Sequence, residues 1–186
     1  MEKAPVFDVV ERMTALIRSE ERKKCTEFGL QLVHLQVLDY LSRCNKYSDT
    51  PAALTNYLGM TRGTVSQTLL LLEKKGFIKK TTDSIDRRVV HLSLLLEGNA
   101  MLEKARLSEL YGQAFELLDK DELSRFDDVL ITLLSALQKS NKYHTFGLCK
   151  TCQYFTSITN GQFCGLTKEP LTEEDSQKIC QEHTVQ

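Results

Sequence analysis

The stretch from residue 51 to residue 93 constrains the fold most, because two short helices are followed there by two short strands. Thr50 followed by a proline is typical of a helix start, and Gly59 ends this first helix early. A second helix is predicted over residues 62–75, with Gly76 just after its end. Two helices joined by a short turn that contains glycine are typical of a helix-turn-helix.

The hydrophobic pattern then changes from a helical to a strand period. Residues 77–80 and 89–94 are predicted strands, and the polar residues 81–88 between them predict a hairpin with an exposed tip, the wing. Four further amphipathic helices are predicted, over residues 6–22, 32–44, 97–118 and 122–140. The expected fold class is mainly α with a small β-hairpin wing (α+β), a winged helix-turn-helix with a small cysteine-rich C-terminal extension.

The distribution of charge separates two parts of the chain. The formal net charge is -1, which argues against a generally basic nucleic-acid binder. Residues 54–91 nevertheless carry seven basic and three acidic side chains, whereas residues 149–186 carry three basic and five acidic ones. No apolar run reaches the roughly 18 residues of a membrane span, and the first residues do not resemble a signal peptide. We expect a cytoplasmic protein without membrane attachment.

Five short motifs between residues 5 and 140 carry a family resemblance. They are Leu35–Leu41, Leu54 with Leu58, Thr64–Ser66, Leu72–Ile78, and Asp86–Arg88 followed by Leu92–Ser93. Together they resemble the multiple-antibiotic-resistance-regulator (MarR) winged-helix repressors, and the Asp-x-Arg motif followed by Leu-Ser is the most specific part. The resemblance implies a homodimer that binds a pseudo-palindromic double-stranded DNA operator and is released by a small-molecule effector or an oxidant.

The residues themselves also predict DNA contacts. In the helix over residues 62–75 the apolar positions face inward, which leaves a polar face for the major groove. The DNA-binding residues expected on this helix are Arg62, Thr64, Ser66, Gln67 and Thr68. In the wing, Arg87 and Arg88 are expected to bind DNA, with Arg88 at the minor groove, while Asp86 supports Arg88 or the hairpin. The alternative for each is an ordinary solvated surface residue.

The two outer helical regions, residues 6–22 and 122–140, carry more apolar surface than a small winged helix can bury. Pairing with a second copy would cover this surface and would place two recognition helices about one DNA turn, roughly 34 Å, apart. We therefore expect a homodimer, with packing inside one chain as the alternative.

The resemblance ends near residue 143, so we divide the chain into a winged-helix and dimerisation domain, residues 1–143, and a cysteine-rich tail, residues 144–186. Four cysteines of the tail are candidate metal ligands, namely Cys149, Cys152, Cys164 and Cys180. Four thiolates suit a zinc ion or an iron–sulfur cluster. Reversible disulfides, or no cofactor at all, remain the third possibility.

Neighbouring residues complete the prediction for the tail. Tyr154, Phe155 and Phe163 are expected to form a small apolar shell around the metal, and a helix beginning at Thr172 is expected to carry Cys180. His144 and His183 lie near enough in sequence to replace one ligand, although a histidine at a chain end is usually solvated. Cys25 and Cys44 are expected to be small buried or half-buried apolar residues.

These features favour a sequence-specific transcriptional regulator, acting as a repressor. The alternative is a metal-dependent protein-interaction module that uses a winged-helix scaffold. No phosphate-binding glycine loop or catalytic constellation is found, so an enzyme is not expected.

Overall fold

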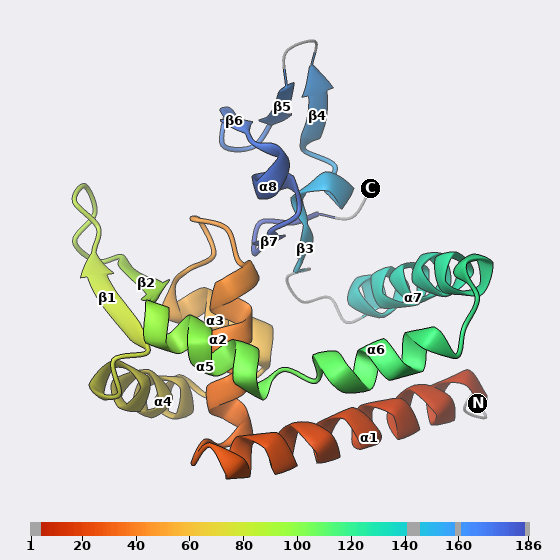
Figure 1. Cartoon of the computed structure of the whole chain (residues 1–186). Helices are drawn as coiled ribbons and strands as arrows, with labels where there is room; N and C mark the ends of the chain where they lie inside the picture. The colour runs from red at the N-terminus through yellow and green to blue at the C-terminus, as the bar shows by residue number, and fades with distance from the viewer. Residues whose placement is uncertain (1–4, 141–145, 159–160, 185–186) are drawn as a thin grey trace.

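The computed structural model describes residues 5–140, 146–158 and 161–184. Its first helices and strands are α1 (Pro5–Glu27), α2 (Leu32–Arg43), α3 (Pro51–Leu58), α4 (Arg62–Lys74), β1 (Ile78–Thr82), β2 (Val90–Leu94), α5 (Leu96–Ala105), α6 (Ser108–Glu116) and α7 (Lys120–Ser140). The tail adds β3 (Gly147–Leu148), the 3₁₀ helix η1 (Cys149–Thr151), β4 (Phe155–Ile158), β5 (Gly161–Cys164), β6 (Glu169–Leu171), α8 (Glu173–Ser176) and β7 (Ile179–Cys180). Figure 1 shows a central body from which α1, α6 and α7 extend to one side and the tail rises on another.

Side-chain caps and glycines set the ends of the two central helices. The Ala53 N–H donates to Thr50 Oγ1 at the start of α3, and the Thr64 N–H donates to Thr61 Oγ1 at the start of α4, both at 3.2 Å. Gly59 ends α3 with a φ of 63°, a left-handed conformation that strains residues with a Cβ. The predicted helix-turn-helix is therefore present.

The wing is an antiparallel pair of β1 and β2 in which Ile78 lies opposite Leu94. The tail has its own three-stranded sheet, β4-β5-β6, and β3 pairs with β7. The fold is mainly helical with a small β-hairpin wing, as the sequence predicts. No helix in the three described ranges is long and apolar enough to cross a membrane.

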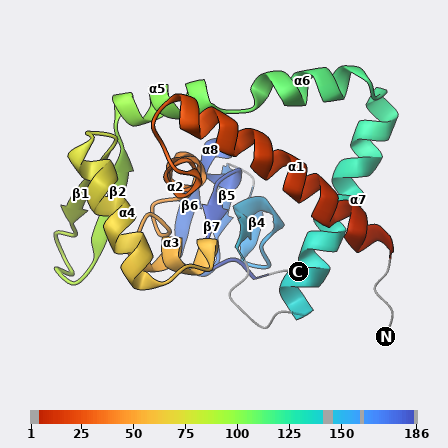
Figure 2. The same ribbon diagram turned by 90° about the horizontal axis from the view of Figure 1, so that it is seen from below.

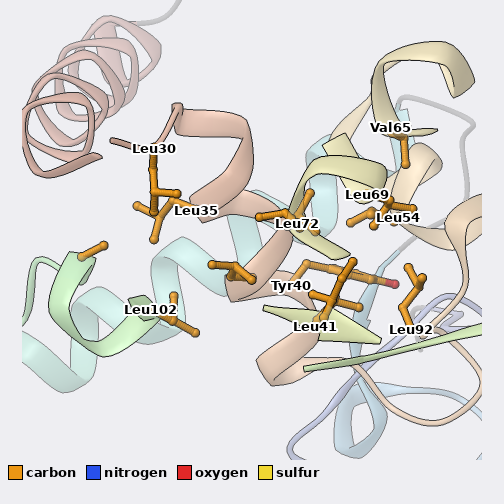
Figure 3. Close-up of a cluster of buried hydrophobic side chains, with 14 of the residues drawn as sticks. Leu30, Leu35, Tyr40, Leu41, Leu54, Val65, Leu69, Leu72, Leu92 and Leu102 are labelled. Atoms are coloured by element: carbon orange, nitrogen blue, oxygen red, sulfur yellow. The ribbon is translucent and has the colours of Figure 1, made fainter. Parts of the chain in front are cut away.

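One hydrophobic core joins the winged-helix elements. Leu38 of α2 is fully buried in this core. Leu54 of α3 and Leu72 of α4 are also fully buried, and Leu92 of β2 and Leu102 of α5 belong to the same cluster (Figure 3). Helix α4 and the wing therefore have fixed positions on one scaffold.

The tail packs into this same core. Ile179 is 5% exposed and belongs to the main hydrophobic cluster. Phe146 lies edge-on to Tyr40 and Tyr57, with ring centroids 6.4 and 5.2 Å away. The two parts of the chain thus share a hydrophobic contact.

Two predicted helices are wrong in detail. The single helix expected over residues 97–118 is two helices, α5 and α6, because the chain is extended at Arg106. Ala105 and Leu107 are both buried, and side chains two residues apart cannot lie on one helix face. Cys180 was expected on a helix, but it lies on β7, since α8 ends at Ser176.

Figure 2 shows α6 and α7 leading away from the body, with α1 crossing the space between the body and α7. These helices keep large apolar side chains exposed, including Val9 of α1, Phe115 of α6 and Leu134 of α7. Every residue of α7, all of which the structure describes, is at least partly exposed. This apolar surface faces solvent in a single chain.

Candidate nucleic-acid interface and cysteine cluster

The outer face of α4 carries four of the five residues expected to contact DNA. They are all exposed: Arg62, Thr64, Ser66 and Gln67. The first turn of the helix is fixed by the Thr61 cap, whose hydroxyl also lies 2.9 Å from Thr64 Oγ1. The exposed side chains at this end of α4 can donate hydrogen bonds to a ligand and accept hydrogen bonds from it.

Thr68 is the exception, because it lies on the inner face of α4. It is 6% exposed and its hydroxyl donates to the Thr64 carbonyl oxygen at 2.9 Å. Its position three residues after Val65 and four before Leu72 puts it on the buried face of the helix. The expectation that Thr68 contacts DNA is therefore corrected.

In the wing, Arg88 is held by Asp86 in a two-point ion pair. Arg88 Nε donates to Asp86 Oδ1 and Arg88 Nη2 to Asp86 Oδ2, each at 2.9 Å. The Arg88 side chain is still 90% exposed, and Arg87 beside it is exposed as well. The guanidinium lowers the pKa of Asp86, and the carboxylate raises the pKa of Arg88. The wing therefore presents a cation in a fixed direction.

A second carboxylate, which the sequence analysis did not single out, shapes the wing tip. Asp83 Oδ1 accepts from the N–H groups of Ile85 and Asp86 at 2.8 and 2.7 Å. These hydrogen bonds, with a contact from His91, lower the pKa of Asp83. An aspartate two residues before the tip is typical of an Asx turn, and this signal could have identified it.

The base of the wing is tied to the segment that precedes α3. His91 Nδ1 lies 2.6 Å from Asp49 Oδ1, and His91 Nε2 lies 3.4 Å from Asp83 Oδ2. The Asp49 hydrogen bond is the main reason that the pKa of His91 is raised. Lys80 of β1 also pairs with Glu73 of α4 at 2.9 Å. The orientation of the wing relative to α4 is thus set by polar contacts at its base.

The four cysteines of the tail lie around one small cavity. A pocket of about 30 Å³ is lined by Cys149, Cys152, Cys164 and Cys180. Tyr154 and Phe155 also line it, whereas Phe163 does not. A pocket of this volume has room for a single ion.

Polar hydrogens point at the sulfurs in this cluster. Asn45 Nδ2 lies 3.6 Å from Cys149 Sγ, and the Thr184 N–H lies 3.4 Å from Cys152 Sγ. The Cys149 thiol donates to Cys180, which lowers the pKa of Cys180 to about 6 and raises the pKa of Cys149. Within the described ranges, no three His, Cys, Asp or Glu side chains are already spaced to hold a metal ion.

Of the two histidines considered as replacement ligands, His183 differs from the expectation of a solvated side chain. His183 is buried, at 6% exposure, and its Nε2 lies 2.9 Å from Thr151 Oγ1. The His183 ring packs against Gly147, where an added Cβ would lie 2.6 Å from His183 Nε2. His183 is therefore a packing residue rather than a solvated one. His144 lies outside the described residues. Outside the tail, Cys25 is buried and Cys44 half-buried, and burial raises the pKa of both thiols.

A larger cavity, of about 620 Å³, lies where α1, α2 and α5 meet. Its lining combines the apolar side chains of Leu35 and Leu102 with Tyr57 and the charged pair Arg43 and Asp39. A small molecule with both apolar and polar groups would find partners there.

Comparison with known sequences finds similarity in the part of the chain that carries α4 and the wing. A sequence model described as the MarR family matches residues 28–89, which include α2, α3, α4 and the wing up to Val89. The Escherichia coli regulators PrsX and PapX, both described as HTH-type transcriptional regulators, are 27% and 28% identical over 115 residues. The match covers 55% of this chain and 69% or 70% of theirs.

Solved structures have the same fold. The S. aureus MepR–DNA complex superposes with a TM-score of 0.58 at 21% identity, and the apo form of E. coli MarR with a TM-score of 0.57 at 19% identity. These matches cover 73% and 72% of this chain and 99% of each of theirs. Both structures are therefore matched almost completely, while part of this chain extends beyond them.

Proposed function

We propose, on the premise that this chain carries a winged-helix domain of the MarR family, that it is a sequence-specific DNA-binding regulator of transcription, acting as a repressor in the cytoplasm. The observation that carries the proposal is the pairing of an exposed polar face on α4 with a wing whose Arg88 is held in place by Asp86. The DNA-binding surface comprises Arg62, Thr64, Ser66, Gln67, Arg87 and Arg88. Polar side chains of α4 would read base edges in the major groove, and Arg88 would enter the minor groove.

The exposed apolar surface of α1, α6 and α7 supports a homodimer. Apolar patches of this extent on a soluble chain mark interfaces, and a two-fold pair buries the same patch on both copies. Such a dimer would present two α4 helices to one duplex. The operator would then be an inverted repeat with half-sites roughly 10 base pairs apart.

The cavity of about 620 Å³ beside α1, α2 and α5 supports regulation by a small molecule. It lies between the helices of the winged-helix body and α1, which carries part of the exposed apolar surface. A ligand that favours one arrangement of these helices would change DNA affinity by that difference in binding.

We further propose that Cys149, Cys152, Cys164 and Cys180 bind a zinc ion. The support is that four thiols from separate parts of the tail line one small pocket, and that zinc prefers four such ligands in a tetrahedron. The side chains would close around the ion on binding. Elemental analysis of the purified chain should find about one zinc per chain, whereas iron with visible absorption would mean a cluster instead.

Selection of duplexes from a random pool by the full-length chain tests the DNA-binding proposal. We expect enrichment of an inverted repeat that the Arg88→Ala variant binds more weakly. Binding without enrichment of any sequence, in the wild-type chain, would contradict a sequence-specific regulator.

A further inference from the structure

The turn between α2 and α3, residues 44–49, touches both the cysteine cluster and the wing. Asn45 and Ser48 within it are buried, at 6% and 0% exposure. The Asn45 side chain organises the turn, because its Oδ1 accepts from Ser48 Oγ at 2.7 Å and from the Tyr47 N–H at 3.1 Å. We call this segment the α2–α3 turn.

On one side, the α2–α3 turn is bound to the tail by backbone and side-chain hydrogen bonds. The Asn45 N–H donates to the Ile179 carbonyl oxygen at 2.9 Å, and Asn45 Nδ2 donates to Cys149 Sγ at 3.6 Å. Gln181 donates through its backbone N–H to Ser48 Oγ at 2.8 Å and through Nε2 to the Tyr47 carbonyl oxygen at 2.7 Å. The partners in the tail are therefore a cysteine of the cluster and residues flanking a second one, Cys180.

On the other side, the same turn holds the DNA-binding elements. The backbone carbonyl oxygen of Asp49 accepts a hydrogen bond from the Leu92 N–H at 2.7 Å. The Asp49 side-chain carboxylate lies 2.6 Å from Nδ1 of His91, which is on the same wing strand, β2. The Tyr40 hydroxyl donates to the Ser48 carbonyl oxygen at 2.7 Å, and Thr50, directly after the turn, caps α3. Hydrogen bonds, together with the backbone of the α2–α3 turn, thus connect Cys149 to the base of the wing.

We propose that zinc held by the four cysteines controls DNA affinity by fixing the α2–α3 turn and, through it, the wing. This inference rests on the proposed DNA-binding function and names its regulation. The loaded chain binds its operator tightly, and loss of zinc weakens that binding. Although Ile179 and Phe146 anchor the tail on the main core, the part that carries the four cysteines is too small to stay folded without its metal, so zinc loss loosens the hydrogen bonds to Asn45 and Ser48.

Thermodynamic linkage also predicts the effect of operator DNA on zinc affinity. If zinc raises operator affinity by some factor, the operator must raise zinc affinity by the same factor. A coupling of the usual size gives a change of roughly five-fold to a hundred-fold in each direction. The site would then act as a zinc sensor rather than as a structural support alone.

The experiment uses the full-length chain and a duplex selected from a random pool by the zinc-loaded protein. Zinc is removed with a chelator, restored, and operator affinity is measured in all three states, while circular dichroism follows helix content. Cobalt replaces zinc in a parallel sample, because its thiolate absorption bands report how many sulfurs bind. We expect four-sulfur coordination, a loss of affinity of roughly five-fold or more without metal, and recovery when zinc returns.

Two variants separate coupling from metal binding. Asn45→Ala removes the side-chain contact with Cys149 and also the hydrogen bonds that Asn45 Oδ1 accepts within the turn, whereas Gln181→Ala removes only the contact with the Tyr47 carbonyl. Combined, they should keep about one zinc per chain while operator affinity depends on zinc less than in the wild type, because only the backbone N–H bonds of residues 45 and 181 to the other segment remain. Gln181→Ala alone tests the same link if the double variant fails to fold. Cys25→Ser is the control, since this buried cysteine lies outside the cluster and should leave both measurements unchanged.

The outcomes are distinct. Equal operator affinity with and without bound zinc would overturn the coupling, and so would a zinc response in the uncoupled variants equal to that of the wild type. Absence of zinc from the purified chain and failure of cobalt to bind would overturn the metal site. If no duplex is selected at all, the proposed DNA-binding function fails, whereas the metal measurements still decide the site.

Discussion

Carboxylates give the wing tip its shape at the scale of single residues. Ile85 at the tip is 95% exposed, so no hydrophobic contact can order this loop. Asp83 instead binds two backbone N–H groups, and Asp86 binds both the backbone and the side chain of Arg88. A side chain that is already held in one direction loses less conformational freedom when it binds. The wing therefore holds Arg88 in position for the proposed contact with DNA.

Arg88→Ala should weaken operator binding by roughly ten-fold or more and reduce the slope of log affinity against log salt by about one. The reason is that a fixed guanidinium in the minor groove meets concentrated negative potential. Fluorescence anisotropy at several salt concentrations measures both effects. Lys104→Ala, which removes an exposed cation from α5, is the control and should change neither. Equal losses in the two variants would mean that Arg88 acts only through net charge.

His91→Gln should destabilise the chain at low pH more than at high pH. The pKa of His91 is raised above its usual 6.5, chiefly by its hydrogen bond to Asp49. Its stabilising effect is therefore complete below about pH 6.5 and is lost as the pH rises through the raised value. Urea unfolding of both chains at about pH 6 and about pH 8.5 measures the gap between them. A gap that widens at the higher pH would show that the Asp49 contact does not favour the charged imidazole.

At the scale of elements, the sequence predicts those helix ends that carry a local signal. Thr50 and Thr61 as caps and Gly59 and Gly76 as terminators all lie where the pattern places them. The helix break at Arg106 has no glycine or proline to signal it. It arises because Ala105 at the end of α5 and Leu107 just after it are both buried, which a continuous helix would not allow. Such a break depends on tertiary packing, which local pattern does not contain.

The candidate sites divide in the same way. Helical periodicity correctly exposes Arg62, Ser66 and Gln67, and the spacing from Val65 and Leu72 also places Thr68 on the buried face. The expected DNA contact of Thr68 gave more weight to its polar side chain than to its position. The contact between Asn45 and Cys149 joins residues 104 positions apart, and no spacing rule can predict it. Contacts of this length follow from how the tail docks, which only the structure shows.

Helix α5 offers a matched pair with α6 for testing how closely the elements pack. A Cβ at Gly98 would lie 2.2 Å from the Phe77 carbonyl oxygen, whereas a Cβ at Gly112 would meet no atom within 4 Å. Gly98→Ala must push α5 away from the start of the wing and should cost about 2 kcal/mol. Gly112→Ala should stabilise by up to about 1 kcal/mol, because alanine favours a helix. Urea unfolding at one protein concentration checks both, and an unchanged Gly98→Ala variant would refute the close contact.

At the scale of the whole molecule, α1 connects the exposed apolar surface to the helices that carry the proposed DNA-binding surface. α5 packs on α2 through Leu102 and Ala105, and α1 contacts both of these helices. The spacing of the two recognition helices in a dimer would therefore depend on how the outer helices pair. Any change in that pairing would alter which half-site spacing fits.

Leu134→Glu should break the dimer and with it most of the operator affinity. Leu134 is 55% exposed in the middle of α7, and a buried unpaired carboxylate at a dimer interface is strongly unfavourable. Light scattering after gel filtration should then give the mass of one chain instead of two, and a single half-site should bind as well as the full inverted repeat. Leu96→Glu is the control, because Leu96 is 82% exposed at the first residue of α5 and is not part of α1, α6 or α7, so it should leave the dimer intact. A dimer that survives Leu134→Glu would mean that the apolar side of α7 does not form the interface.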